Sequence, residues 1–123
     1  MIKHRGEHRF TMPTPALHYR HHAASKCTFG TFGYSGVRGL NALLATVTTT
    51  ESAPVVVAQR LRRGSCGSAR GAGRLIADAI TTTRRLPGLQ HQKILVRADS
   101  AFYGRPSIHA ALTAGADVSI TMR

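Results

Sequence analysis

The chain is poor in acidic residues, and this scarcity limits the metal chemistry available to it. Only five of its 123 residues carry a carboxylate side chain: Glu7, Glu51, Asp78, Asp99 and Asp117. Residues 8–50 contain neither Asp nor Glu. Divalent ions such as Mg²⁺ need several oxygen ligands and give up their water reluctantly. Any metal-dependent activity would therefore have to be built from these five side chains.

Long apolar segments are also lacking. The longest purely apolar runs are short, such as VVVA at residues 55–58, whereas about 20 residues are needed to cross a bilayer. No apolar stretch follows the charged first ten residues, which excludes an ordinary secretory signal. Cys27 and Cys66 lie far apart in the sequence and indicate unpaired thiols in a reducing compartment. We expect a cytoplasmic chain without a membrane span.

Aromatic residues are few, with four Phe, three Tyr and no Trp. A core must therefore be built mainly from Ala, Val, Leu and Ile. The length fits one small domain. Such a domain buries roughly two thirds of the surface of its unfolded chain.

Positive charge, in contrast, is abundant. The chain has 17 Lys and Arg residues and a formal net charge of +12. Fourteen of the 17 are Arg, which binds phosphate in a bidentate way. This balance favours association with polyanions such as DNA. Five arginines gather around the turn RRGSCG and are candidates for DNA contact, although a merely solvated face is the alternative. They are Arg60, Arg62, Arg63, Arg70 and Arg74.

The chain divides into two segments of different character. Residues 1–28 hold five of the seven His, together with Pro13 and Pro15, and show no apolar periodicity. We expect an irregular or disordered segment there. Residues 29–123 alternate between apolar runs and turn signals, which indicates a folded domain.

Within residues 29–123 the apolar pattern predicts four strands and two helices. Strands are expected at Leu43–Thr50, Val55–Leu61, Lys93–Ala98 and Asp117–Met122, and helices from a cap at Ser68 to Arg85 and at Arg105–Gly115. The first two strands are joined by a short break, as in an antiparallel hairpin. The order of elements predicts an α/β fold with a mixed sheet and helices packed on it.

Asp99 is the sharpest candidate for a functional carboxylate. It comes directly after the apolar run KILVRA, and α/β sheets usually bind ligands in the crevice outside such strand ends. An Asp at this position can also cap the next turn. A hydrolase or phosphotransferase with Asp99 as its nucleophile would need a second acid close by, as in a DxD pair, but residue 101 is Ala.

Several segments resemble a known family in the same order. ILVRADSAFY, the helix after it and AGADVSITMR resemble the DDE-domain transposases of bacterial insertion sequences. FGYSGVRGLNALLATV, the hairpin after it and SARGAGRLIADAI are similar to that family as well. The resemblance is collinear and covers about residues 29–123.

The resemblance implies an RNase H-like fold and a metal-dependent reaction on DNA. In that family three acids hold two divalent ions, Mg²⁺ or Mn²⁺, which promote DNA strand cleavage and transfer. Asp99 matches the second acid and would be both the catalytic and the metal-binding residue. The partners implied are the DNA ends of an insertion sequence. The expected process is DNA transposition, a form of DNA recombination.

The chain departs from the family pattern at the other two acids. The first should lie on an opening strand upstream of FGYSGVRG, where no Asp or Glu occurs. The third should lie on a helix beyond Arg123, and neither Asp78 nor Asp117 matches it. We therefore expect a transposase fragment with a partial RNase H-like fold that lacks its opening strand and has lost its activity. The alternative is a non-catalytic basic DNA-binding module or a regulator of an intact transposase.

Overall fold

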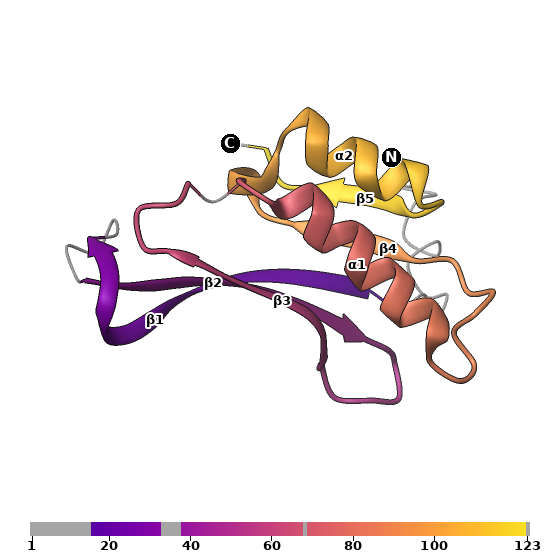
Figure 1. Cartoon of the computed structure of the whole chain (residues 1–123). Helices are drawn as coiled ribbons and strands as arrows, with labels where there is room; N and C mark the ends of the chain where they lie inside the picture. Colours follow the sequence, from indigo (N-terminus) through magenta and orange to yellow (C-terminus); the bar gives the residue numbers. More distant parts are fainter. Residues whose placement is uncertain (1–15, 33–37, 68, 123) are drawn as a thin grey trace, which may run out of the picture.

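The structure is a computed structural model that describes residues 16–32, 38–67 and 69–122. Five strands form one sheet in the order β3-β2-β1-β4-β5. Two α-helices lie side by side on one face of this sheet (Figure 1). The predicted α/β class with a mixed sheet and packed helices is confirmed.

Four of the five strands run in one direction. β1 (Ala16–Phe32) pairs antiparallel with β2 (Arg38–Thr48), and β2 pairs antiparallel with β3 (Val55–Arg63). β4 (Leu95–Ala98) pairs parallel with both β1 and β5 (Asp117–Ile120). Strands β3, β1, β4 and β5 are therefore parallel to one another. Their carboxyl ends point to the same side of the sheet, which we call the carboxyl edge.

β1 differs from the expectation for the first segment. Residues 16–28 were expected to be irregular, but they lie in a strand between β2 and β4. This strand takes the position of the opening strand that the sequence analysis expected the chain to lack. Main-chain pairing explains the difference: β2 pairs along β1, and β4 pairs with Ala16–His18 on the other side. Strand formation depends more on such neighbouring strands than on local pattern. Residues 1–15 of the expected irregular segment lie outside the described residues.

The hairpin of β2 and β3 was predicted correctly, but its bounds differ from the prediction. β2 begins at Arg38 and ends at Thr48, and β3 continues to Arg63. Along β2, the side chains of Leu43, Ala45 and Val47 are buried and alternate with half-buried ones. This period of two places one face of the strand against the helices. Thr49 closes the loop by accepting hydrogen bonds from the backbone N–H groups of Glu51 and Ser52, at 3.3 and 3.1 Å.

Helix α1 (Ala72–Arg85) begins later than the predicted cap. Gly71, with φ 79°, precedes it in the left-handed region that glycine tolerates best. The predicted cap Ser68 lies outside the described residues. The buried face of α1 follows the predicted three- and four-residue spacing. It consists of Ala72, Leu75, Ile76, Ala79, Ile80 and Thr83.

The chain continues from β4 through a short 3₁₀ turn (Ser100–Phe102) into helix α2 (Arg105–Thr113). The helices approach closely at their amino ends. A Cβ atom on Gly73 would lie 2.8 Å from the carbonyl oxygen of Pro106. Glycine at this position thus permits the contact that joins the two helix starts at the carboxyl edge.

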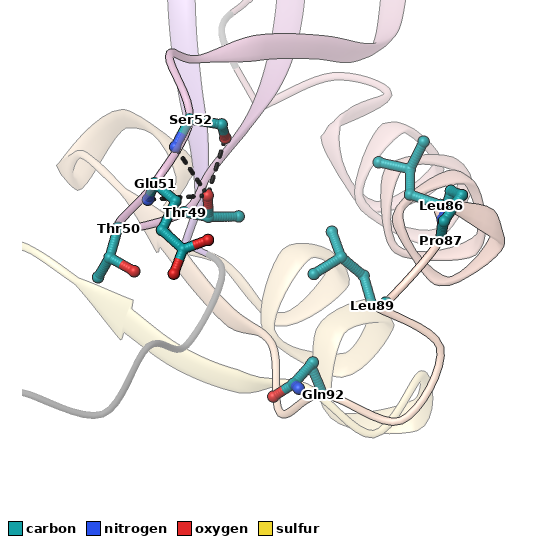
Figure 2. A pocket seen from close by; sticks show the side chains of 9 residues that line it. Thr49, Thr50, Glu51, Ser52, Leu86, Pro87, Leu89 and Gln92 are labelled. Atoms are coloured by element: carbon teal, nitrogen blue, oxygen red, sulfur yellow. Dashed lines mark hydrogen bonds between the residues drawn. The ribbon is translucent and has the colours of Figure 1, made fainter.

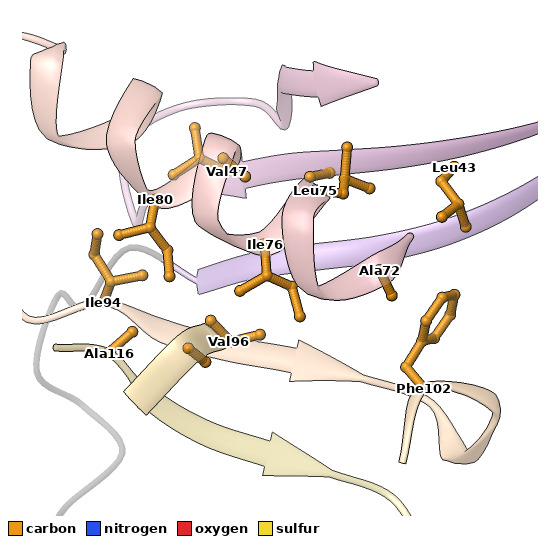
Figure 3. Packing of buried hydrophobic residues seen from close by; sticks show 13 residues of the cluster. Leu43, Val47, Ala72, Leu75, Ile76, Ile80, Ile94, Val96, Phe102 and Ala116 are labelled. Carbon is orange, nitrogen blue, oxygen red and sulfur yellow. The ribbon is translucent and has the colours of Figure 1, made fainter. Parts of the chain in front are cut away.

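The core lies between the sheet and the helices and is mainly aliphatic, as the composition predicts. Leu43, Leu75, Ile76 and Val96 are almost completely buried within it. Figure 3 shows Phe102, from the turn after β4, beside the start of α1. This turn is therefore fixed by the same core that holds the first turn of α1.

Candidate functional site

Asp99 lies directly after β4 at the carboxyl edge, where the sequence placed it. Its side chain is exposed, and its Oδ1 accepts a hydrogen bond of 2.8 Å from the backbone N–H of Ala101. This bond caps the 3₁₀ turn that follows. A shallow hollow beside it is lined by Asp99, Ser100, Ala101 and Thr121. Asp99 thus performs the capping role that the sequence left open, at a position accessible to a ligand.

The other described carboxylates lie away from Asp99. Asp117 begins β5 and pairs with Leu95 at the amino end of β4. Leu95 is about 13 Å from Asp99, at roughly 3.3 Å per residue along the strand. Glu51 lies in the hairpin loop after the end of β2, and that end also pairs near the amino side of the sheet. Asp78, on α1, is bound to Arg60 with 2.8 Å between Oδ2 and Nη2.

The residues present do not fit the pair of divalent ions that the transposase resemblance implies. β1 runs beside β4, but residues 16–32 contain neither Asp nor Glu. Among the described residues, no group of three or more His, Cys, Asp or Glu side chains is placed to hold a metal ion. Asp99 alone supplies too few oxygen ligands to displace the water of Mg²⁺. No step of a metal-dependent reaction is therefore assigned to this chain.

The five predicted DNA-binding arginines divide into two groups. Arg60 and Arg62 point to the helix side of β3, since strand residues two apart share a face. Arg60 forms the ion pair with Asp78. Arg62 donates from Nη1 to the backbone carbonyls of Gly67 and Arg70, at 2.9 and 2.6 Å. Both side chains are thus used in contacts within the chain.

Arg62 is half-buried, and this burial has an electrostatic consequence. Desolvation lowers the pKa of the Arg62 guanidinium from its ordinary value, and Cys66 acts in the opposite direction. Its Nη2 donates to Oδ1 of Asn41, at 2.7 Å. Asn41 is 6% exposed and was not singled out from the sequence. No local signal identifies it in the sequence, because its contact depends on its cross-strand pairing with Arg62.

The second group, Arg63, Arg70 and Arg74, is exposed at the carboxyl edge. Arg63 ends β3, Arg70 lies in the connection to α1, and Arg74 lies in the first turn of that helix. The first turn of α1 carries no acidic residue, so its positive dipole end adds to the charge of the arginines. Arg63 points to the face of the sheet opposite Arg62, and all three arginines add positive charge at this edge, which suits an anion.

Arg105 adds to this positive charge and was missed in the sequence. It is exposed at the first position of α2, next to Pro106, whose carbonyl lies close to Gly73 of α1. The signal was its place at a helix start shortly after the strand that ends at Asp99. We call the four exposed residues Arg63, Arg70, Arg74 and Arg105 the arginine surface.

A second hollow lies at the opposite end of the sheet (Figure 2). It is formed by the hairpin loop and by the segment that leads from α1 to β4, with Leu86, Pro87 and Leu89 on one side. Glu51 is the one ionisable residue in its lining. The lining therefore contains no cluster of ionisable side chains.

The arrangement of the elements is similar to that of a transposase catalytic domain. The chain is similar to the crystal structure of the catalytic domain of the Mos1 mariner transposase, with a TM-score of 0.57 and 10% sequence identity. The match covers 84% of this chain and 47% of the other, so the chain spans about half the length of that domain. No protein-family model matches the chain. No curated protein matches it either.

The similarity confirms the RNase H-like fold expected from the sequence, since a likeness at 10% identity concerns the fold alone. It leaves the bacterial insertion-sequence assignment and the roles of individual residues as predictions. In the described part of the chain, no helix is both long and apolar enough to cross a membrane.

Proposed function

We propose that this chain is an insertion-sequence transposase fragment that binds DNA and does not itself cut or join DNA strands. The proposal depends on one observation, the composition of the carboxyl edge. There the arginine surface presents four exposed guanidinium groups, whereas Asp99 is the one carboxylate at that edge within the described residues. Such an edge attracts phosphate and lacks the ligands for two divalent ions.

The location of the arginine surface supports DNA as the partner. In α/β sheets, ligands bind outside the carboxyl ends of the strands. The arginines lie at this edge, at the end of β3, just before α1 and in the first turns of α1 and α2, and the contact between Gly73 and Pro106 holds the two helix starts together. A DNA backbone along this edge would meet positive charge from both helix starts. DNA ends of an insertion sequence are the natural ligand of a chain with this resemblance.

A regulatory role toward an intact transposase stays a prediction, as does a cytoplasmic location. Both follow from the resemblance and the composition. DNA binding at the carboxyl edge is the property that either role would need.

The test compares arginines at the two ends of α1. The full chain and its variants are titrated onto a short mixed-sequence duplex DNA at several salt concentrations, with fluorescence anisotropy as the readout. Each bound phosphate contributes about 0.9 to the slope of log affinity against log salt. Arg70→Gln combined with Arg74→Gln should therefore lower that slope by up to about 1.8.

The matched control is Arg85→Gln, which removes the same kind of charge from the exposed last residue of α1, at the other end of the helix. We expect its slope to stay close to that of the unmodified chain. Equal reductions of the slope in the two variants would contradict binding at the carboxyl edge. Absence of DNA binding by the unmodified chain would contradict the proposed function itself.

A further inference from the structure

The connection between β3 and α1, described for residues 64–67 and 69–71, contacts a side chain from the strand before it. Arg62 and Asn41 are directly paired across β3 and β2. The Arg62 Nη2 donates to Asn41 Oδ1 at 2.7 Å, and Asn41 is almost completely buried. One end of the guanidinium is thus anchored to the sheet.

The other end of the guanidinium reaches the connection. Nη1 donates to the carbonyl oxygens of Gly67 and Arg70, at 2.9 and 2.6 Å. These carbonyls also belong to a tight turn, because the N–H of Arg70 donates to the oxygen of Gly67 at 3.1 Å. Gly71, with φ 79°, then redirects the chain into α1. Arg62 therefore joins the sheet to the residues that immediately precede the helix.

The arrangement requires the shape of arginine. A guanidinium is a rigid planar fork with five N–H donors, so it can serve three acceptors on opposite sides at once. Hydrogen bonds from a charged donor are also stronger than neutral ones. The bond from Arg62 to Asn41 is partly buried, whereas the two bonds to the carbonyls are exposed.

We infer that Arg62 is a positioning residue for DNA binding, which fixes the β3–α1 connection so that Arg70 and Arg74 are presented at the carboxyl edge. This inference rests on the proposed function and assigns Arg62 a different part in it from the phosphate contact expected from the sequence. Its guanidinium binds three protein acceptors. A connection ordered before binding loses less conformational entropy when DNA is bound.

The first test separates positioning from phosphate contact in the full chain. Arg62→Gln should speed hydrogen exchange at the N–H groups of Cys66, Arg70 and Ala72, which are hydrogen-bonded in the connection. Its affinity for a short mixed-sequence duplex DNA should fall about tenfold, with an unchanged salt slope. The exposed neighbour is the control: Arg63→Gln should leave hydrogen exchange unchanged and lower the slope by about 0.9.

A second variant keeps the test decisive if Arg62→Gln does not fold. Asn41→Leu removes the anchor on β2 and leaves every charge in place, so it should also speed exchange in the connection and weaken DNA binding without a change of slope. Thermal unfolding followed by circular dichroism checks that the variant retains its fold.

Two results would overturn the inference. One is an unchanged exchange rate in the connection in both variants. The other is a slope that falls by about 0.9 in Arg62→Gln, which would mark Arg62 as a phosphate contact. Either result leaves the proposed function intact, provided that the unmodified chain binds DNA. Failure of the unmodified chain to bind would overturn the proposed function, whatever the exchange rates.

Discussion

The two connections at the carboxyl edge differ in what their side chains can bind. In the β4–α2 connection, Asp99 is exposed but uses Oδ1 to cap its own turn. In the β3–α1 connection, Arg62 is turned inward and leaves Arg70 and Arg74 exposed at the positive end of a helix. Within the described residues, the scaffold therefore presents charge suited to DNA phosphate at one connection and a single carboxylate at the other. A fold does not by itself determine the chemistry of its site.

The largest predicted effect concerns the core that both connections share. Ile76 is 2% exposed and packs between the sheet and the helices. Ile76→Ala should reduce the free energy of unfolding by about 2–5 kcal/mol, because it removes buried methyl groups and leaves a cavity. Urea unfolding measures this reduction. The exposed control Thr81→Ala should change the free energy of unfolding by less than about 0.5 kcal/mol. Similar reductions of the free energy of unfolding in both variants would show that α1 is not packed as described.

A smaller effect tests whether the two connections are held together. Gly73→Ala should destabilise the chain by about 1–3 kcal/mol through overpacking, although Ala is the better helix former. The reason is the 2.8 Å approach of its Cβ to the Pro106 oxygen. Gly67→Ala is the control, since its Cβ would meet nothing within 4 Å. A rise in melting temperature for Gly73→Ala would contradict the close contact of the helix starts.

The next prediction isolates the role of Asp99. Asp99→Ala should cost about 1 kcal/mol by removing the cap, whereas Asp99→Asn keeps an acceptor oxygen and should be nearly neutral. Mg²⁺ and Mn²⁺ should leave the melting temperature of the unmodified chain unchanged, because a bound ligand would stabilise it. A Mn²⁺-dependent rise in melting temperature that disappears in Asp99→Asn would reveal a metal site. The β4–α2 connection would then bind a metal ion, contrary to the difference drawn between the two connections.

The smallest effect sharpens the contrast between Arg60 and Arg62. Arg60 and Asp78 form an ion pair with side chains 32% and 54% exposed. Exposed pairs contribute about 0.2–1 kcal/mol, so a double-mutant cycle of Arg60→Gln and Asp78→Asn should give a coupling energy in this range. The ion pair joins Arg60 to α1 and not to the β3–α1 connection. Hydrogen exchange in that connection should therefore be unchanged in Arg60→Gln. Faster exchange in Arg60→Gln would assign the positioning role to both arginines.

Much of the fold could be predicted from local pattern. The hairpin, helix α1 and helix α2 follow from apolar spacing, because their residues carry the signal of the face that they bury. β1 could not be predicted in this way. Residues 16–28 have no apolar periodicity, and their strand depends on hydrogen bonds to β2 and, at Ala16–His18, to β4, which lie elsewhere in the sequence.

The candidate site was predictable in position and less so in detail. A strand followed by Asp placed Asp99 at the carboxyl edge, and a basic turn located the arginine cluster. The inward orientation of Arg62 depends on Asn41, 21 residues away in the sequence, and on carbonyl oxygens of the following turn. Only cross-strand register brings these groups together. Such contacts leave no local signal in a single sequence.

The most direct test of DNA binding without cutting is one titration of the full chain onto supercoiled duplex DNA in Mg²⁺ and then in Mn²⁺, with binding and strand integrity read from the same samples. We predict salt-dependent binding and intact supercoiled DNA in both ions. Failure to bind would contradict the role of the arginine surface. Nicked or linear DNA that disappears with Asp99→Asn would contradict the loss of catalysis.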